Sequence, residues 1–239
     1  IGGGASPQPG EASLAHHGVL FLDELTEFRR DVLEALRQPL EDREVTVARA
    51  QSTLSFPASF QLVAAANPCP CGYLGDDRRD CSCTPMAVQR YRARLSGPLL
   101  DRLDLQVAVP AVPWRQLSAH RRGEASASVA ARVAAARVRL AARFAGLGLR
   151  NNGEMGPEEI RRWARPDGDG RRLLEHASRG LGLSARAYHR ILRVARTIAD
   201  LAATEALSAA HLAEAIAYRC LDREPASRPK AADGWPAGS

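Results

Sequence analysis

Two short apolar runs, each followed at once by polar residues, constrain the fold of this chain most. Residues 18–22 form the run Gly-Val-Leu-Phe-Leu and stop at Asp23 and Glu24; residues 61–66 form a second run that stops at Asn67. Continuous hydrophobicity over so few residues predicts strands of a parallel sheet, buried on both faces. The carboxyl ends of parallel strands line the ligand crevice of an open α/β sheet, so these polar residues are the first candidates for chemistry.

The pattern around the two runs changes near residue 112. Before it, alternating elements typical of an α/β fold are predicted: a helix over 29–40 interrupted late by Pro39, a hairpin over 44–56, a helix over 86–95 and a third strand over 103–109. After it, apolar spacing and N-cap residues predict only helices, over 125–145, 157–164, 184–203 and 208–219. We expect an α/β part over residues 1–112, an all-α part over 113–223 and a disordered tail over 224–239.

Hydrophobicity along the chain excludes two classes of protein. Nowhere do 18 apolar residues run together, and no charged-then-apolar leader opens the sequence. Membrane-spanning and secreted proteins carry such segments. We therefore expect a cytoplasmic protein with no membrane partner.

Positive charge is concentrated in one region. Residues 121–200 hold 17 arginines against 8 acidic residues, whereas the whole chain has a net charge of +6. A local excess of arginine indicates an acidic partner such as nucleic acid or nucleotide phosphate. An arginine-biased genome whose helices are solvated by arginine explains the same pattern equally well.

The polar residues after the two runs suit the hydrolysis of a nucleoside triphosphate. Asp23 at a strand tip can hold Mg²⁺, Glu24 can polarise the attacking water, and the Asn67 amide can orient the same water. Arg102 could project onto the phosphate of a neighbouring subunit as an arginine finger. Each has an ordinary alternative: acidic and Asn-Pro turns for the first three, and a surface ion pair with Asp101 or Asp104 for Arg102.

Four of the five cysteines form two close pairs. Cys69 and Cys71 are separated by nine residues from Cys81 and Cys83. Two such pairs can supply four thiolates to one structural Zn²⁺, although Cys-x-Cys is tighter than the usual spacing. Reduced thiols without a ligand and a redox disulfide are the alternatives.

Several longer segments resemble the magnesium-chelatase-like AAA+ ATPases of the ComM/YifB type. The resemblance rests on Pro9-Gly10-Glu11, on the runs 16–25, 34–41, 66–72 and 95–102, and on 184–197 within a C-terminal stretch over 184–223. It implies an incomplete AAA+ P-loop-type core with a parallel sheet, followed by an all-α C-terminal lid domain. It also implies ATP and Mg²⁺ as ligands and a homo-oligomeric ring, a hexamer, in the complete protein.

The resemblance assigns a role to each candidate. Asp23 and Glu24 match the Walker B pair, Asn67 the sensor-1 residue, Arg102 the arginine finger, and Arg186 the sensor-2 arginine that reaches the nucleotide from the lid. Arg186 falls in the first turn of a predicted helix, where the dipole opposes a cation, so an anion beside it is expected. The hairpin resembles an insert that faces the central channel in relatives, and Arg49 at its tip would then contact the DNA backbone.

One departure from the family pattern limits what this segment can do. Lys230 is the only lysine, so the loop Gly-x-x-x-x-Gly-Lys-Ser/Thr that cradles phosphates is absent from the sequence. In the family that loop precedes the part corresponding to Ile1. We expect this segment by itself to bind ATP poorly and to hydrolyse none.

The resemblance implies part of an ATP-hydrolysing motor that acts on DNA, with branch-migration or helicase activity in natural transformation or recombination. Two alternatives remain. One is a magnesium-chelatase ATPase subunit that drives metal insertion into a porphyrin. The other is a non-catalytic, zinc-stabilised module that binds nucleic acid. Salt-dependent DNA binding and ATP turnover by the complete protein distinguish the three.

Overall fold

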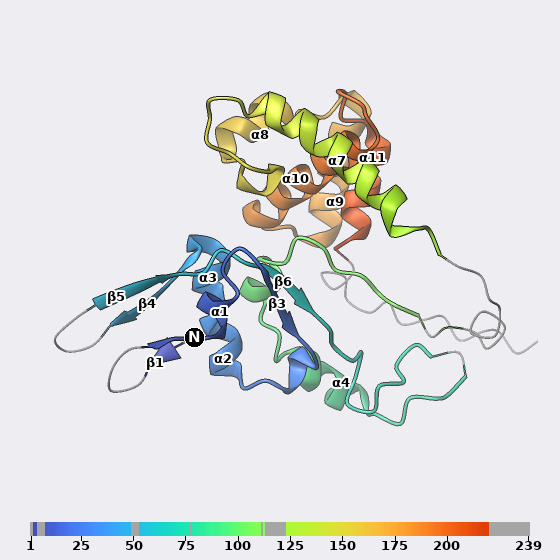
Figure 1. Ribbon diagram of the computed structural model, residues 1–239. Helices are drawn as coiled ribbons and strands as arrows, with labels where there is room; N and C mark the ends of the chain where they lie inside the picture. The colour runs from blue at the N-terminus through green and yellow to red at the C-terminus, as the bar shows by residue number, and fades with distance from the viewer. Residues whose placement is uncertain are drawn as a thin grey trace, which may run out of the picture.

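The chain folds into an α/β part and a helical part. The computed structural model describes residues 2–3, 8–48, 53–76, 78–110, 112 and 123–219. Figure 1 shows the helices of the C-terminal part gathered on one side of the strands and short helices of the N-terminal part. The α/β elements precede the long helices along the chain, whereas residues 113–122 and the tail predicted over 224–239 lie outside the described residues.

The centre of the α/β part is a parallel pair of strands. β3 (Val19–Leu22) pairs with β6 (Gln61–Ala64), with Val19 opposite Gln61 and Leu22 opposite Ala64. This confirms both predicted strands and their parallel direction. Leu20 and Leu22 face a buried cluster that is shared with α2 (Arg30–Ala35), α3 (Arg37–Asp42) and α5 (Gly97–Leu100). Its buried members are Leu25, Leu33, Leu36 and Leu99.

The prediction that these strands are buried on both faces is wrong for this structure. Val19 is 58% exposed, Phe21 60% and Val63 41%. These three side chains alternate with the inward-facing residues of the same strands, so they share the opposite face. The described helices cover only one side of the pair, which leaves this apolar face open.

The helix predicted over 29–40 is split in two. α2 (Arg30–Ala35) ends at Leu36, and α3 (Arg37–Asp42) follows it directly. Pro39 has no N–H to give the carbonyl of Ala35, and its ring crowds that carbonyl. The break therefore falls about one turn before the proline and not at it.

The predicted hairpin is confirmed. β4 (Glu44–Ala48) and β5 (Thr53–Pro57) are antiparallel, with Val45 opposite Phe56. Val45 is buried against Ala12 of the short helix α1 (Glu11–Leu14). A further two-stranded pair joins β1 (Gly2–Gly3) to β2 (Gln8–Pro9). Arg49, the predicted DNA contact at the hairpin tip, lies outside the described residues.

Two short helices follow the cysteine-rich loop. α4 (Pro85–Arg92) corresponds to the helix predicted over 86–95, and α5 (Gly97–Leu100) ends two residues before Arg102. Thr84 and Ser96 cap them, accepting hydrogen bonds from Ala87 N (3.2 Å) and Leu99 N (3.3 Å).

The third strand predicted over 103–109 is wrong. In the part of the chain that the structure describes, only Gln106 forms a β-bridge there, and its partner is Arg219 from the helical part. Leu105, Val107 and Val109 are 55%, 64% and 85% exposed. The segment is apolar enough for a strand, but it runs along the helical part instead of along β3 or β6, so it gains no ladder of hydrogen bonds.

The C-terminal part is entirely helical, as predicted. It contains α7 (Ser126–Arg143), α8 (Pro157–Trp163), α9 (Gly168–Leu181), α10 (Ala185–Leu201) and α11 (Ala209–Ala217), which share one buried apolar cluster. The sequence did not predict α9, because its first turn holds two glycines. Asp167 nevertheless caps it by accepting from Gly170 N (2.7 Å), and Leu174 and Ala177 are buried in the shared cluster.

A polar network lies inside this helical core. Asp200 is fully buried and forms ion pairs with Arg143 and Arg196, and Asn152 donates to it at 2.8 Å. Burial by itself would raise the pKa of Asp200, but the hydrogen bonds and charges of these neighbours outweigh burial and lower it. The carboxylate therefore stays ionised and joins α7, α10 and the turn η2 (Asn152–Glu154).

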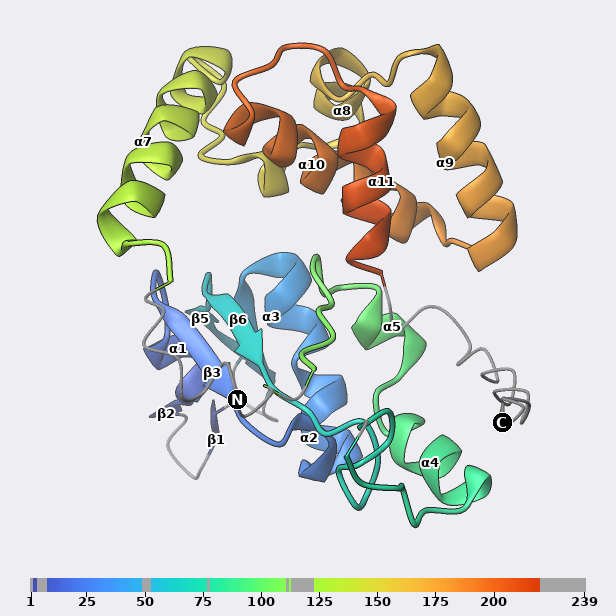
Figure 2. The ribbon, with the colours of Figure 1, turned by 90° about the vertical axis from the view of Figure 1, so that its right-hand side faces the viewer.

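Direct contacts connect the two parts. Arg190 of α10 pairs with Asp104, Ser184 Oγ donates to Asp101 at 2.8 Å, and Tyr218 O accepts from Gln106 N at 2.8 Å. These contacts attach the segment after α5 to both ends of the α10–α11 pair. Figure 2 shows α5 directly below the end of α11.

Candidate functional site

The first group of candidate residues lies at the carboxyl ends of β3 and β6. Leu22 O accepts from Ala65 N at 2.9 Å, and Ala65 O accepts in turn from Leu25 N at 2.8 Å. The two chain segments therefore run side by side past the strand ends, one carrying Asp23 and Glu24 and the other leading to Asn67. The structure thus places the carboxylates and the amide at one edge of the sheet, where parallel α/β sheets bind ligands.

A tight turn fixes the two carboxylates. Glu24 has φ +49°, in the left-handed region, which costs a residue with a side chain about 1–2 kcal/mol. Its N–H donates to Asp23 Oδ1 at 2.8 Å, and its carbonyl accepts from Glu27 N at 2.7 Å within η1 (Leu25–Glu27). Asp23, Glu24 and Glu27 line a shallow hollow with Phe28. Carboxylate oxygens are ligands that a hard divalent cation such as Mg²⁺ prefers.

The second group contains both candidate arginines. Arg102 forms an ion pair with Glu41 of α3, and its Nη1 donates to Pro98 O at 2.7 Å. Arg186, in the first turn of α10, pairs with the same carboxylate at 3.2 Å. Glu41 is thus the anion expected beside Arg186. Arg102 pairs with Glu41 and not with Asp101 or Asp104, the partners considered for a surface ion pair.

Glu41 stays ionised between the two arginines. Partial burial would raise its pKa, but the hydrogen bond and charge of Arg102, followed by the charge of Arg186, outweigh this and hold the pKa below its usual value. Glu41 was not predicted as a site residue, although it ends one of the segments on which the family resemblance rests.

The two groups lie apart within one chain. In Figures 1 and 2 the arrowheads of β3 and β6 point away from the helices of the C-terminal part, whereas Arg186 belongs to that part. Among the described residues, neither Arg102 nor Arg186 contacts Asp23, Glu24 or Asn67; both bind Glu41. The structure therefore brings together the acidic pair with the amide, and separately the two arginines.

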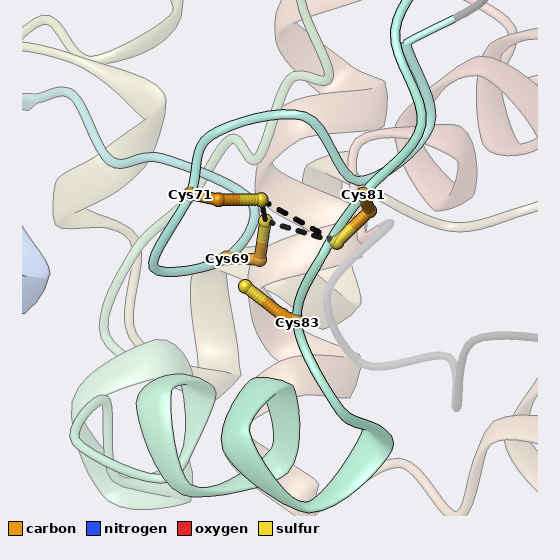
Figure 3. A group of neighbouring side chains, drawn as sticks. All are labelled: Cys69, Cys71, Cys81 and Cys83. Atoms are coloured by element: carbon orange, nitrogen blue, oxygen red, sulfur yellow. Dashed lines mark hydrogen bonds between the residues drawn. The ribbon is translucent and has the colours of Figure 1, made fainter.

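The four clustered cysteines converge on one point. Cys69 Sγ lies 3.4 Å from Cys71 Sγ, and each of these sulfur atoms lies 3.6 Å from Cys81 Sγ. All four Sγ atoms, including that of Cys83, lie within 4.8 Å of one another. Figure 3 shows the four side chains pointing toward a common centre. A tetrahedral Zn²⁺ with Zn–S bonds of about 2.3 Å requires sulfur atoms about 3.8 Å apart, so this donor set fits the metal.

The four thiols do not ionise equally readily. The Tyr73 N–H hydrogen bonds to Cys71 and lowers the pKa of this thiol to about 5. At Cys81 and Cys83, a backbone hydrogen bond would lower the thiol pKa, but burial and the hydrogen bonds from neighbouring cysteines outweigh it and raise the pKa, to about 12 for Cys81. Cys69 is fully buried, and the other three cysteines are partly exposed at the edge of the loop. None of the four is in a disulfide.

The cysteine-rich loop is tied to the acidic end of the sheet on both sides. Before the loop, Asn67 is two residues from Cys69 in the sequence. After it, the Thr26 hydroxyl donates to the Tyr91 hydroxyl on α4, and Arg94 donates to Thr26 O at 2.8 Å. No local pattern predicts Thr26 and Tyr91 as partners, because they are 65 positions apart.

Within the described ranges, no helix is both long enough and apolar enough to cross a bilayer.

Comparison with known proteins identifies the family. Residues 1–117 match the family model described as "Magnesium chelatase, subunit ChlI", and residues 123–219 match "Magnesium chelatase, subunit ChlI C-terminal". The chain belongs to the magnesium-chelatase-like family. The boundary between the two matches falls close to the change from α/β to helical structure, so each part of this magnesium-chelatase-like chain corresponds to one family region.

The relatives of this magnesium-chelatase-like chain include proteins named YifB and ComM, in agreement with the family resemblance seen in the sequence. It is 48% identical over 225 residues to "Uncharacterized protein YifB" of Salmonella typhimurium and to "Competence protein ComM" of Haemophilus influenzae. It is 44% identical over 221 residues to "Uncharacterized protein Mb2921c" of Mycobacterium bovis. These alignments cover 92–93% of this chain but only 43% of each relative, so the chain spans less than half of their length.

Proposed function

We propose that this chain supplies the Walker B, sensor and arginine parts of an AAA+ motor that binds and hydrolyses ATP in a longer protein. The observation that carries the proposal is the pairing of β3 with β6, which sets Asp23 and Glu24 beside the segment that ends at Asn67. Mg²⁺ held by Asp23 would neutralise charge on the phosphates. Glu24 would take the proton of the attacking water, and the Asn67 amide would orient that water.

The arginine pair supports an oligomer. Arg102 and Arg186 share Glu41 and lie apart from the carboxylates of their own chain. Two guanidiniums held together suit a common anion, and the terminal phosphate of a nucleotide bound by a neighbouring subunit provides one. A ring, which we propose to be a homo-hexamer, would then complete each site with residues of two subunits.

The exposed apolar face of the β3–β6 pair supports the proposal that this chain holds only part of the ATPase core. Parallel sheets are covered on both faces, whereas Val19, Phe21 and Val63 are exposed here. We propose that the phosphate-cradling part of the ATPase core packs on this face in the longer protein. The 239-residue segment by itself would then bind ATP poorly and show no turnover.

We further propose that the four cysteines hold one structural Zn²⁺. The convergence of their sulfur atoms supports it, and the metal would fix a polar loop that has little apolar core of its own. We also propose a cytoplasmic location, because the cytoplasm keeps cysteine side chains reduced and available to a metal.

DNA is the partner that the charge distribution favours. The excess of arginine over residues 121–200 includes the exposed side chains of Arg161, Arg162, Arg165 and Arg171. A cluster of guanidinium groups attracts the phosphates of the DNA backbone, and this attraction does not depend on the base sequence. The relative named as a competence protein fits a role in handling DNA during natural transformation, by branch migration or helicase activity.

The test uses the full-length protein that contains this segment. We expect ATP turnover to rise when branched DNA is added, and DNA binding to weaken steeply between 50 and 200 mM salt, with a slope that reports several phosphates (about 0.9 per phosphate). Turnover that responds to a porphyrin and not to DNA would favour a magnesium-chelatase subunit. Salt-dependent DNA binding without ATP turnover would favour a non-catalytic module.

A further inference from the structure

One carboxylate, that of Glu41, contacts both arginines that the proposed function assigns to a phosphate. It lies in the last turn of α3, bound by Arg102 on one oxygen and by Arg186 on the other. The two arginines come from different parts of the chain: Arg102 follows α5, and Arg186 begins α10. Glu41 is therefore the point where the α/β part holds both of them.

The two arginines depend on Glu41 to different degrees. The Arg102 side chain is only 7% exposed and is also held by Pro98 O, so burial restricts its position. The Arg186 side chain is 60% exposed, and Glu41 is its ion-pair partner among the described residues. Without that carboxylate, repulsion between the two guanidiniums and the gain in rotamer freedom would both move Arg186 into solvent.

The charge balance at this point leaves room for a further anion. Two guanidiniums against one carboxylate carry a net charge of +1, and a guanidinium offers five donors, more than one carboxylate can use. The backbone beside Arg102 is fixed as well, because Leu103 O accepts from Arg219 at 2.7 Å and Asp104 pairs with Arg190. The site is thus assembled before any phosphate arrives, as electrostatic stabilisation of a transition state requires.

We propose that Glu41 is a positioning residue that gathers Arg102 and Arg186 into one preformed anion site for the transferred phosphate. This inference rests on the proposed function. Glu41 acts only through the arginines and does not touch the nucleotide. Its loss should therefore lower the rate of the chemical step more than it weakens the binding of ATP.

The experiment measures steady-state ATP hydrolysis by the full-length protein and its Glu41→Gln variant. Glutamine keeps the size and one acceptor of the side chain but removes the charge. We expect kcat to fall roughly tenfold to a hundredfold, because a small misplacement of a catalytic group costs up to about a hundredfold, with KM for ATP within about twofold. Asp42→Asn is the matched control: Asp42 is the next residue of α3, is exposed and contacts neither arginine. It should leave kcat and KM within about twofold of wild type.

A double-mutant cycle separates positioning from a general structural role. If Glu41 acts through Arg102, Glu41→Gln should cause no further loss of kcat in an Arg102→Ala background. Additive losses, or the same kinetics for Glu41→Gln and Asp42→Asn, would overturn the proposal. If thermal unfolding shows that the Glu41→Gln variant does not fold, the Glu41→Asp variant is measured in its place. A lower kcat at unchanged KM in that variant supports positioning, and a wild-type kcat overturns the proposal. Absence of ATP turnover in the wild-type protein would instead count against the proposed function.

Discussion

The Sγ atoms of Cys69 and Cys71 lie 3.4 Å apart, too far for a disulfide bond of about 2.05 Å and close to the separation of two ligands on one tetrahedral metal. Cys81 and Cys83 bring their sulfur atoms to the same point. The loop between Asn67 and α4 therefore brings its four sulfur atoms together shortly after the end of β6.

The first prediction concerns this cluster. Protein purified without chelator should contain about one zinc per chain, measured by elemental analysis, because four thiolates at this spacing bind Zn²⁺ strongly. Replacing Cys69 and Cys81 with Ser should remove the metal and lower the melting temperature. Cys220 lies outside the cluster in the sequence, so Cys220→Ser is the control and should keep the zinc. Metal-free wild-type protein with the same melting temperature as the double variant would contradict the zinc site.

The second prediction concerns Asp200 in the helical core. Asp200→Asn should destabilise the protein by about 3–5 kcal/mol, because it leaves Arg143 and Arg196 buried without their counter-ion. Chemical denaturation measures this loss. Asp169→Asn removes an exposed carboxylate that also pairs with an arginine, Arg172, and should cost less than about 1 kcal/mol. Equal losses for the two variants would contradict the role of the buried network.

The same network gives a pH dependence. The pKa of Asp200 is lowered in the folded state, so the stability from its ionised form is complete above its unfolded pKa of about 3.9 and is lost as pH falls through the folded value. The difference in unfolding free energy between wild type and Asp200→Asn should be constant from about pH 5 to 7 and should shrink below about pH 4. A difference that grows on acidification would contradict this assignment.

The third prediction concerns the open face of the β3–β6 pair. In the 239-residue chain, Phe21→Ala should change the unfolding free energy by less than about 0.5 kcal/mol, because Phe21 is 60% exposed. In the full-length protein the same change should cost about 3–5 kcal/mol, since we propose that the rest of the core buries this ring. Leu33→Ala, at a site buried in the segment itself, should cost about 2–5 kcal/mol in both. A neutral Phe21→Ala in the full-length protein would contradict the incomplete core.

Much of the fold could be predicted because local patterns determine it. The runs at 18–22 and 61–66 became the parallel pair β3 and β6, and four of the C-terminal helices begin within about two residues of their predicted starts. The third strand failed for a non-local reason: residues 103–109 have strand-like composition, but Arg190, Arg219 and Tyr218 draw the segment to the helical part. α9 was missed because packing of Leu174 overcomes the poor helix propensity of Gly168 and Gly170.

The candidate site was predictable to a similar degree. The strand ends place Asp23, Glu24 and the Asn67 segment side by side, as parallel pairing requires. The shared partner of Arg102 and Arg186 could not be derived from the sequence, because Glu41 is 61 positions from one arginine and far from the other. Whether an arginine meets a phosphate or a carboxylate depends on tertiary and subunit contacts that no local spacing encodes.

We propose that the acidic tip of β3 catalyses ATP hydrolysis, and the decisive variant is Glu24→Gln in the full-length protein. The substitution removes the base but keeps the size of the side chain, so ATP binding should remain while kcat falls by a hundredfold or more, on the order of a general base's contribution. The measurement is single-turnover hydrolysis at saturating ATP, with nucleotide binding followed in the same sample. Hydrolysis at the wild-type rate by the Glu24→Gln protein would contradict the account.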